Sequence, residues 1–589
     1  MQKQNNLSDL ENIVAARSHL GLGNSATQNI GFGTNEVAPG DNVPECDGTR
    51  AFGSWHIDVD TVGGYPAGLA PNHVMPLDAD AKTPYQADKI IISDKDPDPA
   101  QGKDYWLWFN VSDKGPSDNP TISWVSHSGY NCLGMIINDN LYTASGDAGA
   151  MENGIVGRGT NDQTAIWGAA NPKRVNFPYE TQPPIEYGTY SWRVAFALFA
   201  NGNLYVWGQN NLGQCGLGNN NVIPVPTLTD TNVAHVYNDS SQQEYNNDCR
   251  MMIRKKDGTF WGCGYNGRGG LGLGTVADNV NTWQQIPIPG NGQVLSFWNY
   301  GSTFGSTFIQ TTDMRLYACG CGNSGQLGNR SQTDANPNWI DITDDWVPNG
   351  ETVHEIGGGA GFSDTGGNGS CYILMWLKHN GADIIKTAGN NTWGSVGTGT
   401  MGGIVSTPIQ PNIGDLSMGI KQICTSGGCT GVVKILKNDG ELWTWGYNDW
   451  GGLGNGNATS TSTPFLTTSD VDELYFHKNS GHFYGYRLPS FIKKKDGYLY
   501  GCGKNDQGDL GIGNRTNPIT SWVRPLLPSD GKIKFLGNFQ YNGAQWVYVA
   551  VMTDDRVYMW GGGGNHCITG TVVDRLSVYP MQFDMPRGG

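Results

Sequence analysis

The chain has 589 residues and a formal net charge of −16, because 53 Asp and Glu outnumber 37 Lys and Arg. So acidic a chain does not suit nucleic acid, whose phosphates require a basic surface, and we expect no nucleic-acid partner. The longest apolar run, Cys371 to Leu377, is far too short for membrane insertion, and 86 glycines with 29 prolines disfavour long helices.

Residues 1–45 predict one short amphipathic helix. Ser8 or Asp9 caps its start, and Gly21 ends it. Such a helix is marginally stable alone. We therefore expect it to pack against a copy of itself, as in a trimer, against a docking surface, or as a cap on the rest of the chain. Its apolar contact residues are Leu7, Leu10, Ile13, Val14 and Leu20.

The segment Asn5–Asn42 has an NLSDL start, an alanine-containing helix, an LGLG stretch and a VAPGD ending, in that order. It resembles the repeat found in tail fibres of tailed bacteriophages, which often carry several copies where this chain has one. The resemblance implies that residues 1–45 attach the protein to a virus particle.

Residues 46–119 are the least informative part of the sequence. Lys103–Phe109 (KDYWLWF) predicts a strand. Three carboxylates between Asp94 and Asp98 are spaced like the start of a calcium loop, but Pro99 stands where that loop needs glycine, which favours a solvated acidic loop. We expect a linker or small β domain here, or a strand that helps to close the following domain.

From residue 120 onward a thirteen-residue phrase recurs, with LYVWGQNNLGQCG at Leu204–Gly216 as its clearest copy. An Asn-Gly or Asp-Gly dipeptide precedes most copies and predicts a type I′ hairpin turn. A proline-bearing segment follows most copies and predicts an edge strand, because proline lacks the backbone donor. The glycines that end the second hairpin strand lie 56 to 69 residues apart, at Gly208, Gly264, Gly320, Gly389, Gly446, Gly503 and Gly561.

One unit is therefore a hairpin, a glycine turn, a polar loop and an edge strand, which together make one propeller blade. The phrase resembles the RCC1-type β-propeller repeat, and the resemblance extends over residues 120–589. It implies an all-β propeller, and we favour seven blades, the number usual for that family. Eight hairpin units are present, so the first could be an eighth blade or could complete the ring by pairing with the last.

The sequence offers no metal, cofactor or catalytic motif. Cys263, Cys319 and Cys502 stand where other copies hold Trp207 and Trp445, so we expect small buried side chains there. No His or second Cys pair has zinc-like spacing, and neither a G-x-S-x-G elbow nor a phosphate-binding loop occurs. The free thiols suit assembly in a reducing cytoplasm.

Trp393 and Trp450 are the candidate binding residues. They occupy a loop position where other copies hold Leu212, Arg268, Ser324 and Gln507, and this variety indicates exposure to solvent. An exposed Trp can stack on a sugar or anchor a protein contact, although packing between loops is an equal alternative. A second recurring set favours packing between blades: Trp283, Trp339 and Trp522.

Taken together, these features predict a non-enzymatic bacteriophage virion protein, a tail fibre or receptor-binding adhesin located on the particle. The expected partners are tail or capsid proteins at residues 1–45 and a host surface glycan or outer-membrane protein at the propeller. Two alternatives remain, namely a virion-associated polysaccharide depolymerase and a structural interaction protein of the particle.

Overall fold

The computed structural model divides the chain into two compact units, Met1–Asn119 and Pro120–Gly589. The predicted helix with Leu7, Leu10, Ile13, Val14 and Leu20 lies outside the residues that the structure describes. Those residues are short strands within 61–110 and most of 122–583, with gaps at 126, 131–132, 145–153, 158, 160–172, 178, 181, 191–193, 238–249, 301–303, 360–370, 427–430, 476–488, 529–531, 543–544 and 563–576.

The described strands of the first unit form three antiparallel pairs, β1 with β2, β3 with β4 and β5 with β6. The strand predicted at Lys103–Phe109 corresponds in part to β6. The bounds are β1 (Thr61–Val62), β2 (Tyr65–Pro66), β3 (Val74–Leu77), β4 (Pro84–Gln86), β5 (Lys89–Ile92) and β6 (Leu107–Asn110).

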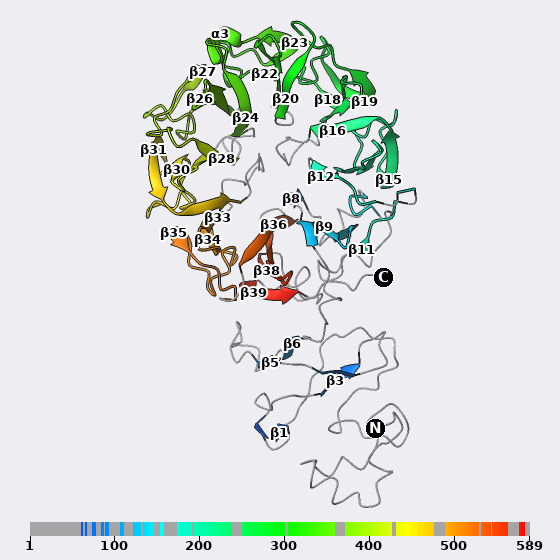
Figure 1. The fold of residues 1–589 in the computed structure, drawn as a ribbon, viewed down its shortest axis with the longest axis vertical. Coiled ribbons are helices and arrows are strands. Elements are labelled where there is room, and N and C mark those ends of the chain that lie inside the picture. Colours follow the sequence, from blue (N-terminus) through cyan, green and yellow to red (C-terminus); the bar gives the residue numbers. More distant parts are fainter. Residues whose placement is uncertain are drawn as a thin grey trace, which may run out of the picture. The chain divides into compact units, whose positions relative to one another are not determined.

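The second unit is a ring of radially arranged antiparallel sheets, with the first strand of each sheet toward the centre and the fourth at the rim (Figure 1). Seven of these sheets hold the repeat copies, and we number them blades 1 to 7. This confirms the predicted all-β, RCC1-like propeller and its seven blades. The first three are blade 1, β12 (Glu186–Tyr190), β13 (Val194–Leu198), β14 (Leu204–Gly208) and β15 (Ile223–Asp230); blade 2, β16 (Val233–Tyr237), β17 (Arg250–Lys255), β18 (Phe260–Asn266) and β19 (Ala277–Gln285); and blade 3, β20 (Val294–Tyr300), β21 (Ser306–Thr311), β22 (Leu316–Cys321) and β23 (Ala335–Asp341).

The other four blades repeat the same order, and one short helix, α3 (Thr343–Trp346), follows blade 3. They are blade 4, β24 (Thr352–Gly359), β25 (Tyr372–His379), β26 (Ala382–Asn390) and β27 (Ile404–Ile409); blade 5, β28 (Ile420–Ser426), β29 (Val432–Lys437), β30 (Leu442–Gly446) and β31 (Thr461–Thr468); blade 6, β32 (Val471–Leu474), β33 (Ser490–Lys494), β34 (Leu499–Gly503) and β35 (Ile519–Val523); and blade 7, β36 (Ile533–Asn542), β37 (Gln545–Met552), β38 (Val557–Gly561) and β39 (Ser577–Phe583).

The sequence left two alternatives for the first hairpin unit, a sheet of its own or pairing with the last blade, and the structure shows both. The unit forms a four-stranded sheet of its own, and β8 pairs in parallel with β36 of blade 7. This N-terminal sheet lies between blades 7 and 1 (Figure 1): Trp207 of blade 1 donates to Ile155 O, and Lys534 of blade 7 donates to Ile122 O. Its strands are β7 (Ile122–Val125), β9 (Leu133–Ile137) and β10 (Asn140–Ala144) with β11 (Lys173–Arg174), and β8 is His127–Tyr130.

The type I′ prediction holds for only one of the five dipeptide turns. In Asn380-Gly381 both residues have positive φ, whereas in the other four turns only the glycine does, as at Gly202. There the Gly202 N–H donates to Phe199 O and the Phe199 N–H to Asn203 O, which is a type I turn followed by a glycine bulge. The first turn residue therefore keeps negative φ, and the bulge supplies the strand twist.

Neighbouring blades are joined by a repeated contact between a Trp or Cys and the preceding blade. Trp445 and Trp560 donate from Nε1 to the carbonyls of Ser395 and Asp509, both at 2.9 Å. The cysteines that replace Trp make the same contact from Sγ, as in Cys502 to Gly452 O at 3.7 Å. The prediction that these cysteines are small buried side chains is confirmed, since Cys263, Cys319 and Cys502 are all buried.

The second recurring tryptophan set also lies between blades, as predicted. Trp283 packs over Gly216, and Trp522 packs over Gly454, so close that an added Cβ would lie 2.5 or 2.6 Å from the indole. Trp339 packs in the same way over Gly272. The glycines of the loop phrase are therefore required because the next blade's indole fills the space of a side chain.

Candidate functional site

The loops between the third and fourth strands all lie at one end of their blades, because the strands alternate in direction. We call this end the loop face, and the opposite end, which carries the hairpin turns, the turn face. A buried asparagine holds each of these loops in blades 1, 2, 4, 5 and 6. In blade 5 the Asn448 Oδ1 accepts from Leu453 N at 2.9 Å, and its Nδ2 donates to Asn457 O at 2.9 Å. The equivalent residues are Asn210, Asn266, Asn391 and Asn505.

Trp393 and Trp450 come together on the loop face. Both pack against one small buried cluster of Val432, Tyr447 and Leu453, and both stay partly exposed. The Trp393 ring meets the Tyr447 ring edge-on, with centroids 5.1 Å apart. Since Trp393 belongs to blade 4 and the others to blade 5, the seam between these blades presents a continuous aromatic surface, which we call the aromatic seam.

The loop position that holds Trp393 and Trp450 is less exposed than the sequence indicates. Ser324 is buried, and Leu212, Arg268 and Gln507 are half-buried. Each loop reaches the following blade, as where the Arg268 guanidinium lies 4.5 Å from the Phe304 ring centroid. Variety at this position therefore reflects different seams between blades as well as contact with solvent.

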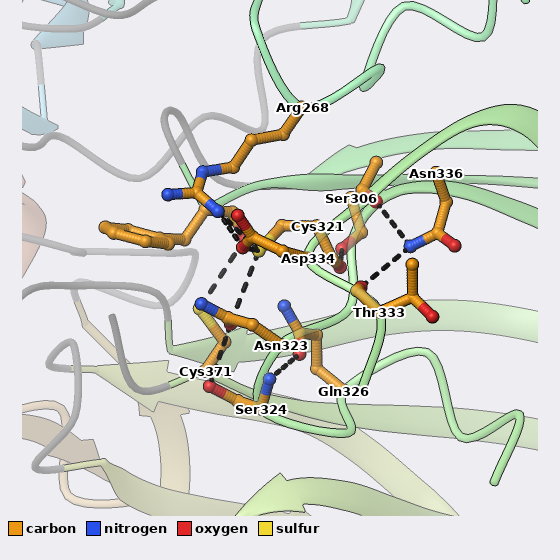
Figure 2. Close-up of polar contacts among 12 residues, drawn as sticks. Arg268, Ser306, Cys321, Asn323, Ser324, Gln326, Thr333, Asp334, Asn336 and Cys371 are labelled. Carbon is orange, nitrogen blue, oxygen red and sulfur yellow. Dashed lines mark hydrogen bonds and ion pairs between the residues drawn. The ribbon is translucent and has the colours of Figure 1, made fainter. Parts of the chain in front are cut away.

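Blade 3 departs from the repeat at Gly322, where blades 1, 2, 4, 5 and 6 have the buried asparagine. An added Cβ at Gly322 would lie 2.7 Å from Thr333 O and 3.1 Å from the Asn336 side chain. The Asn336 Nδ2 instead donates to Thr333 O and to Gly320 O, both at 3.0 Å (Figure 2). Asn336 thus takes over the missing asparagine's task from the neighbouring strand β23.

The altered loop of blade 3 meets Arg268 from blade 2 in a polar cluster (Figure 2). The guanidinium pairs with Asp334 through Nη1, and the same nitrogen lies 4.0 Å from Cys321 Sγ. The Cys321 thiol donates to Asn323 Oδ1 at 3.3 Å. None of these residues was among the predicted binding residues; the signal in the sequence was the glycine at 322 combined with an arginine at 268.

A second polar group lies in the loop of blade 6. Asp509 is 1% exposed, and burial raises the pKa of its carboxyl to about 6, although Lys504 opposes the rise. One carboxylate oxygen accepts from Gln507 N at 3.3 Å. Blades 1 and 3 hold a neutral glutamine at this position, Gln214 and Gln326, so only blade 6 places a titratable group there among these three.

The turn face carries paired charges of both signs. Asp383 of blade 4 is largely enclosed: it accepts from Trp376 Nε1 and Lys378 Nζ, both at 2.8 Å, and from Ile420 N at 2.7 Å. Burial opposes its ionisation, but these donors hold the pKa of Asp383 below its ordinary value. This arrangement ties blade 4 to blade 5.

Among the residues that the structure describes, no three His, Cys, Asp or Glu side chains lie together as metal ligands. In the same residues no helix is long and apolar enough to cross a bilayer.

The sequence profile of the regulator of chromosome condensation (RCC1) repeat matches residues 201–236 and 439–473. The first segment runs from the hairpin turn of blade 1 into the first strand of blade 2, and the second runs from the hairpin turn of blade 5 into the first strand of blade 6. Two segments of the chain therefore match the RCC1 repeat. The matched parts hold the glycine turn, the asparagine-held loop and the outer strand described above, so these features belong to the RCC1 repeat itself.

Part of the chain aligns with parts of eukaryotic proteins. A protein RCC2 homolog of Xenopus laevis is 28% identical over 136 residues, which is 23% of this chain and 23% of that protein. The human X-linked retinitis pigmentosa GTPase regulator is 27% identical over 127 residues, 22% of this chain and 12% of that protein. This chain therefore spans less than a quarter of the length of either relative.

A solved structure of yeast RCC1 (Prp20) bound to Kap60 also matches, with a TM-score of 0.41 and 14% identity. The match covers 65% of this chain and 84% of that one.

The interpretation as a bacteriophage virion adhesin is wrong. The curated relatives named above are eukaryotic RCC2 and GTPase-regulator proteins. The predictions that followed from this interpretation are also wrong, namely the virion location, the tail or capsid partners and the host glycan or outer-membrane receptor. That interpretation depended on a single short copy of a tail-fibre motif outside the described residues, and a local motif of that length does not set the function of the domain that follows.

Proposed function

We propose that this chain is a non-enzymatic regulatory protein that binds a partner protein through the loop face of its propeller. The observation that carries the proposal is the aromatic seam, where Trp393 and Trp450 from adjacent loops share one buried base and remain partly exposed. Large aromatic side chains held rigidly on a buried base are the usual anchors of protein interfaces.

The partner class we favour is a small GTPase. The human relative that matches 22% of this chain is named as a GTPase regulator, and this name supports the choice. The scaffold suits such a role, because the loops are fixed by buried asparagines and neighbouring blades are bonded to each other. A preorganised surface loses little conformational entropy when it binds.

The test measures binding of the full chain to a panel of purified small GTPases, each nucleotide-free, GDP-bound and bound to a GTP analogue, by biolayer interferometry. The variant Trp393→Ala/Trp450→Ala should weaken binding at least tenfold, since truncating an interface tryptophan typically costs about 2 kcal/mol or more. The control is Met418→Ala, which removes a side chain that is 60% exposed in the connection between blades 4 and 5, on the turn face.

Two results would overturn the proposal. If the double variant still binds, the interface lies outside the aromatic seam. If no GTPase in the panel binds, a small GTPase is not the partner. Thermal unfolding of both variants, compared with that of the parent chain, establishes that any loss reflects the surface and not the fold.

A further inference from the structure

The polar cluster between blades 2 and 3 contains two buried donors with no hydrogen-bond partner, Arg268 Nε and Gln326 Nε2. Leaving a buried donor unpaired costs about 1–3 kcal/mol, and native proteins rarely concentrate such groups. Both residues lie near Cys321 (Figure 2), with Arg268 Nη1 4.0 Å from its Sγ. Two unpaired donors therefore flank one point on the loop face.

Blade 1 shows how the repeat normally satisfies this glutamine. There the Gln214 Oε1 accepts from Leu212 N at 2.8 Å, and its Nε2 donates to Asn211 Oδ1 at 3.2 Å. In blade 3 the first contact is kept, since Gln326 Oε1 accepts from Ser324 N at 2.9 Å. The second is absent from the described structure.

The asparagine that would accept this second hydrogen bond in blade 3 is Asn323, and it bonds to other groups instead. Asn323, the counterpart of Asn211, uses its Oδ1 to accept from the Cys321 thiol at 3.3 Å and from the Ser324 hydroxyl at 3.1 Å. The Gln326 amide nitrogen points toward Cys321 and Asn323 (Figure 2). Because Gln326 is only 1% exposed, bulk water has little access to its donor.

Arg268 is also only half engaged. Its contact with Asp334 uses Nη1 alone, whereas Arg315 on the turn face uses both Nε and Nη2 on Asp341. A guanidinium edge presents two parallel donors that fit the two oxygens of a carboxylate. The Arg268 side chain is 22% exposed and that of Asp334 is 59% exposed, so Asp334 has room to leave.

We propose that this cluster is a recognition site for a carboxylate side chain of a partner protein, held by Arg268 and Gln326. Asp334 shows the chemistry that the site accepts, because it is the chain's own carboxylate on the same guanidinium and competes with the incoming one. The proposal adds a contact to the protein-binding role of the loop face and rests on that role. It also accounts for the departure of blade 3 from the repeat.

The test uses fluorescence polarisation with the full chain and fluorescein-labelled decapeptides that alternate glycine with glutamate, glutamine or phosphoserine. The glutamate peptide should bind, and the glutamine peptide should bind about tenfold more weakly, the effect of losing one charge-assisted pair. Arg268→Lys, which keeps the charge but loses the Nε edge, should weaken binding of the glutamate peptide about tenfold. Asp334→Asn should strengthen it by removing the competitor.

Arg268→Lys and Asp334→Asn should change peptide binding in opposite directions. If the pair had only a structural role, both variants would weaken peptide binding. Arg315→Lys, the control on the turn face, should leave peptide binding unchanged. Equal binding of the glutamate and glutamine peptides, preference for phosphoserine, or weaker binding by Asp334→Asn would each overturn the carboxylate assignment. A panel in which no GTPase binds would overturn the proposed partner class but would not change the peptide result, so the two proposals fail separately.

Discussion

Replacing Asp509 with asparagine should stabilise the propeller at neutral and alkaline pH. The Asp509 carboxyl is 1% exposed, and its pKa is raised by burial from 3.8 to about 6. A shift of about two pKa units corresponds to about 3 kcal/mol of preference for the neutral form. Asparagine keeps the shape and the oxygen that accepts from Gln507 N, and it removes the buried charge.

The pH dependence has a definite sign. The folded-state pKa lies above the ordinary value, so the folded protein holds this proton more tightly than the unfolded chain. The cost of the charge is therefore absent below pH 3.8, grows between pH 3.8 and about 6, and is complete above that. The variant should gain about 3 kcal/mol at pH 8 but only about 1 kcal/mol at pH 4.5.

Urea unfolding followed by tryptophan fluorescence at the two pH values measures this gain as a shift of the midpoint. Asp449→Asn serves as the matched control, because this carboxylate is exposed in the corresponding loop of blade 5. A gain that is the same at both pH values, or a loss at pH 8, would refute the argument that burial of the charge is what costs stability.

Three further predictions concern the joints of the ring. Gly446→Ala should destabilise the chain by about 3 kcal/mol, because the new Cβ would lie 2.0 Å from Gly431 O at a φ of 105°, as measured by urea unfolding. Asn448→Ala should cost about 2–3 kcal/mol in the same assay, because it strips the blade 5 loop of its buried hydrogen bonds. Burial raises the pKa of the Cys319 and Cys502 thiols to about 12, so iodoacetamide at pH 8.5 should label these two cysteines only after unfolding, as read by peptide mass spectrometry.

Matched variants separate these effects from general sensitivity to mutation. Gly456→Ala adds a Cβ at a similar positive φ of 84° with no atom within 4 Å, so it should cost only the conformational strain of about 1–2 kcal/mol. Asn438→Ala removes an exposed side chain that donates to Met418 O, with an effect below about 1 kcal/mol. Equal losses within either pair would contradict the reasoning, as would rapid labelling of the native thiols.

The fold could be predicted from the sequence because the same phrase recurs in each blade. Glycines at a fixed place, such as Gly208 and Gly446, mark where the chain must turn with positive φ, and the apolar hairpins before them predict blades. The exposure of Trp393 and Trp450 was predicted less well. Which residues face solvent depends on how a loop meets the next blade, and that contact joins residues some 50 positions apart, as with Trp393 and Tyr447.

The order of hairpin, glycine turn, loop and outer strand was determined by the sequence alone, because turn chemistry and alternating apolar residues act over a few neighbouring positions. Only the tertiary structure decided how the ring closes, with β8 beside β36, and which donors remain unpaired beside Cys321. Both outcomes depend on packing between distant segments. The divided role of the first hairpin unit and the diversion of Asn323 from Gln326 each follow from contacts that no local pattern encodes.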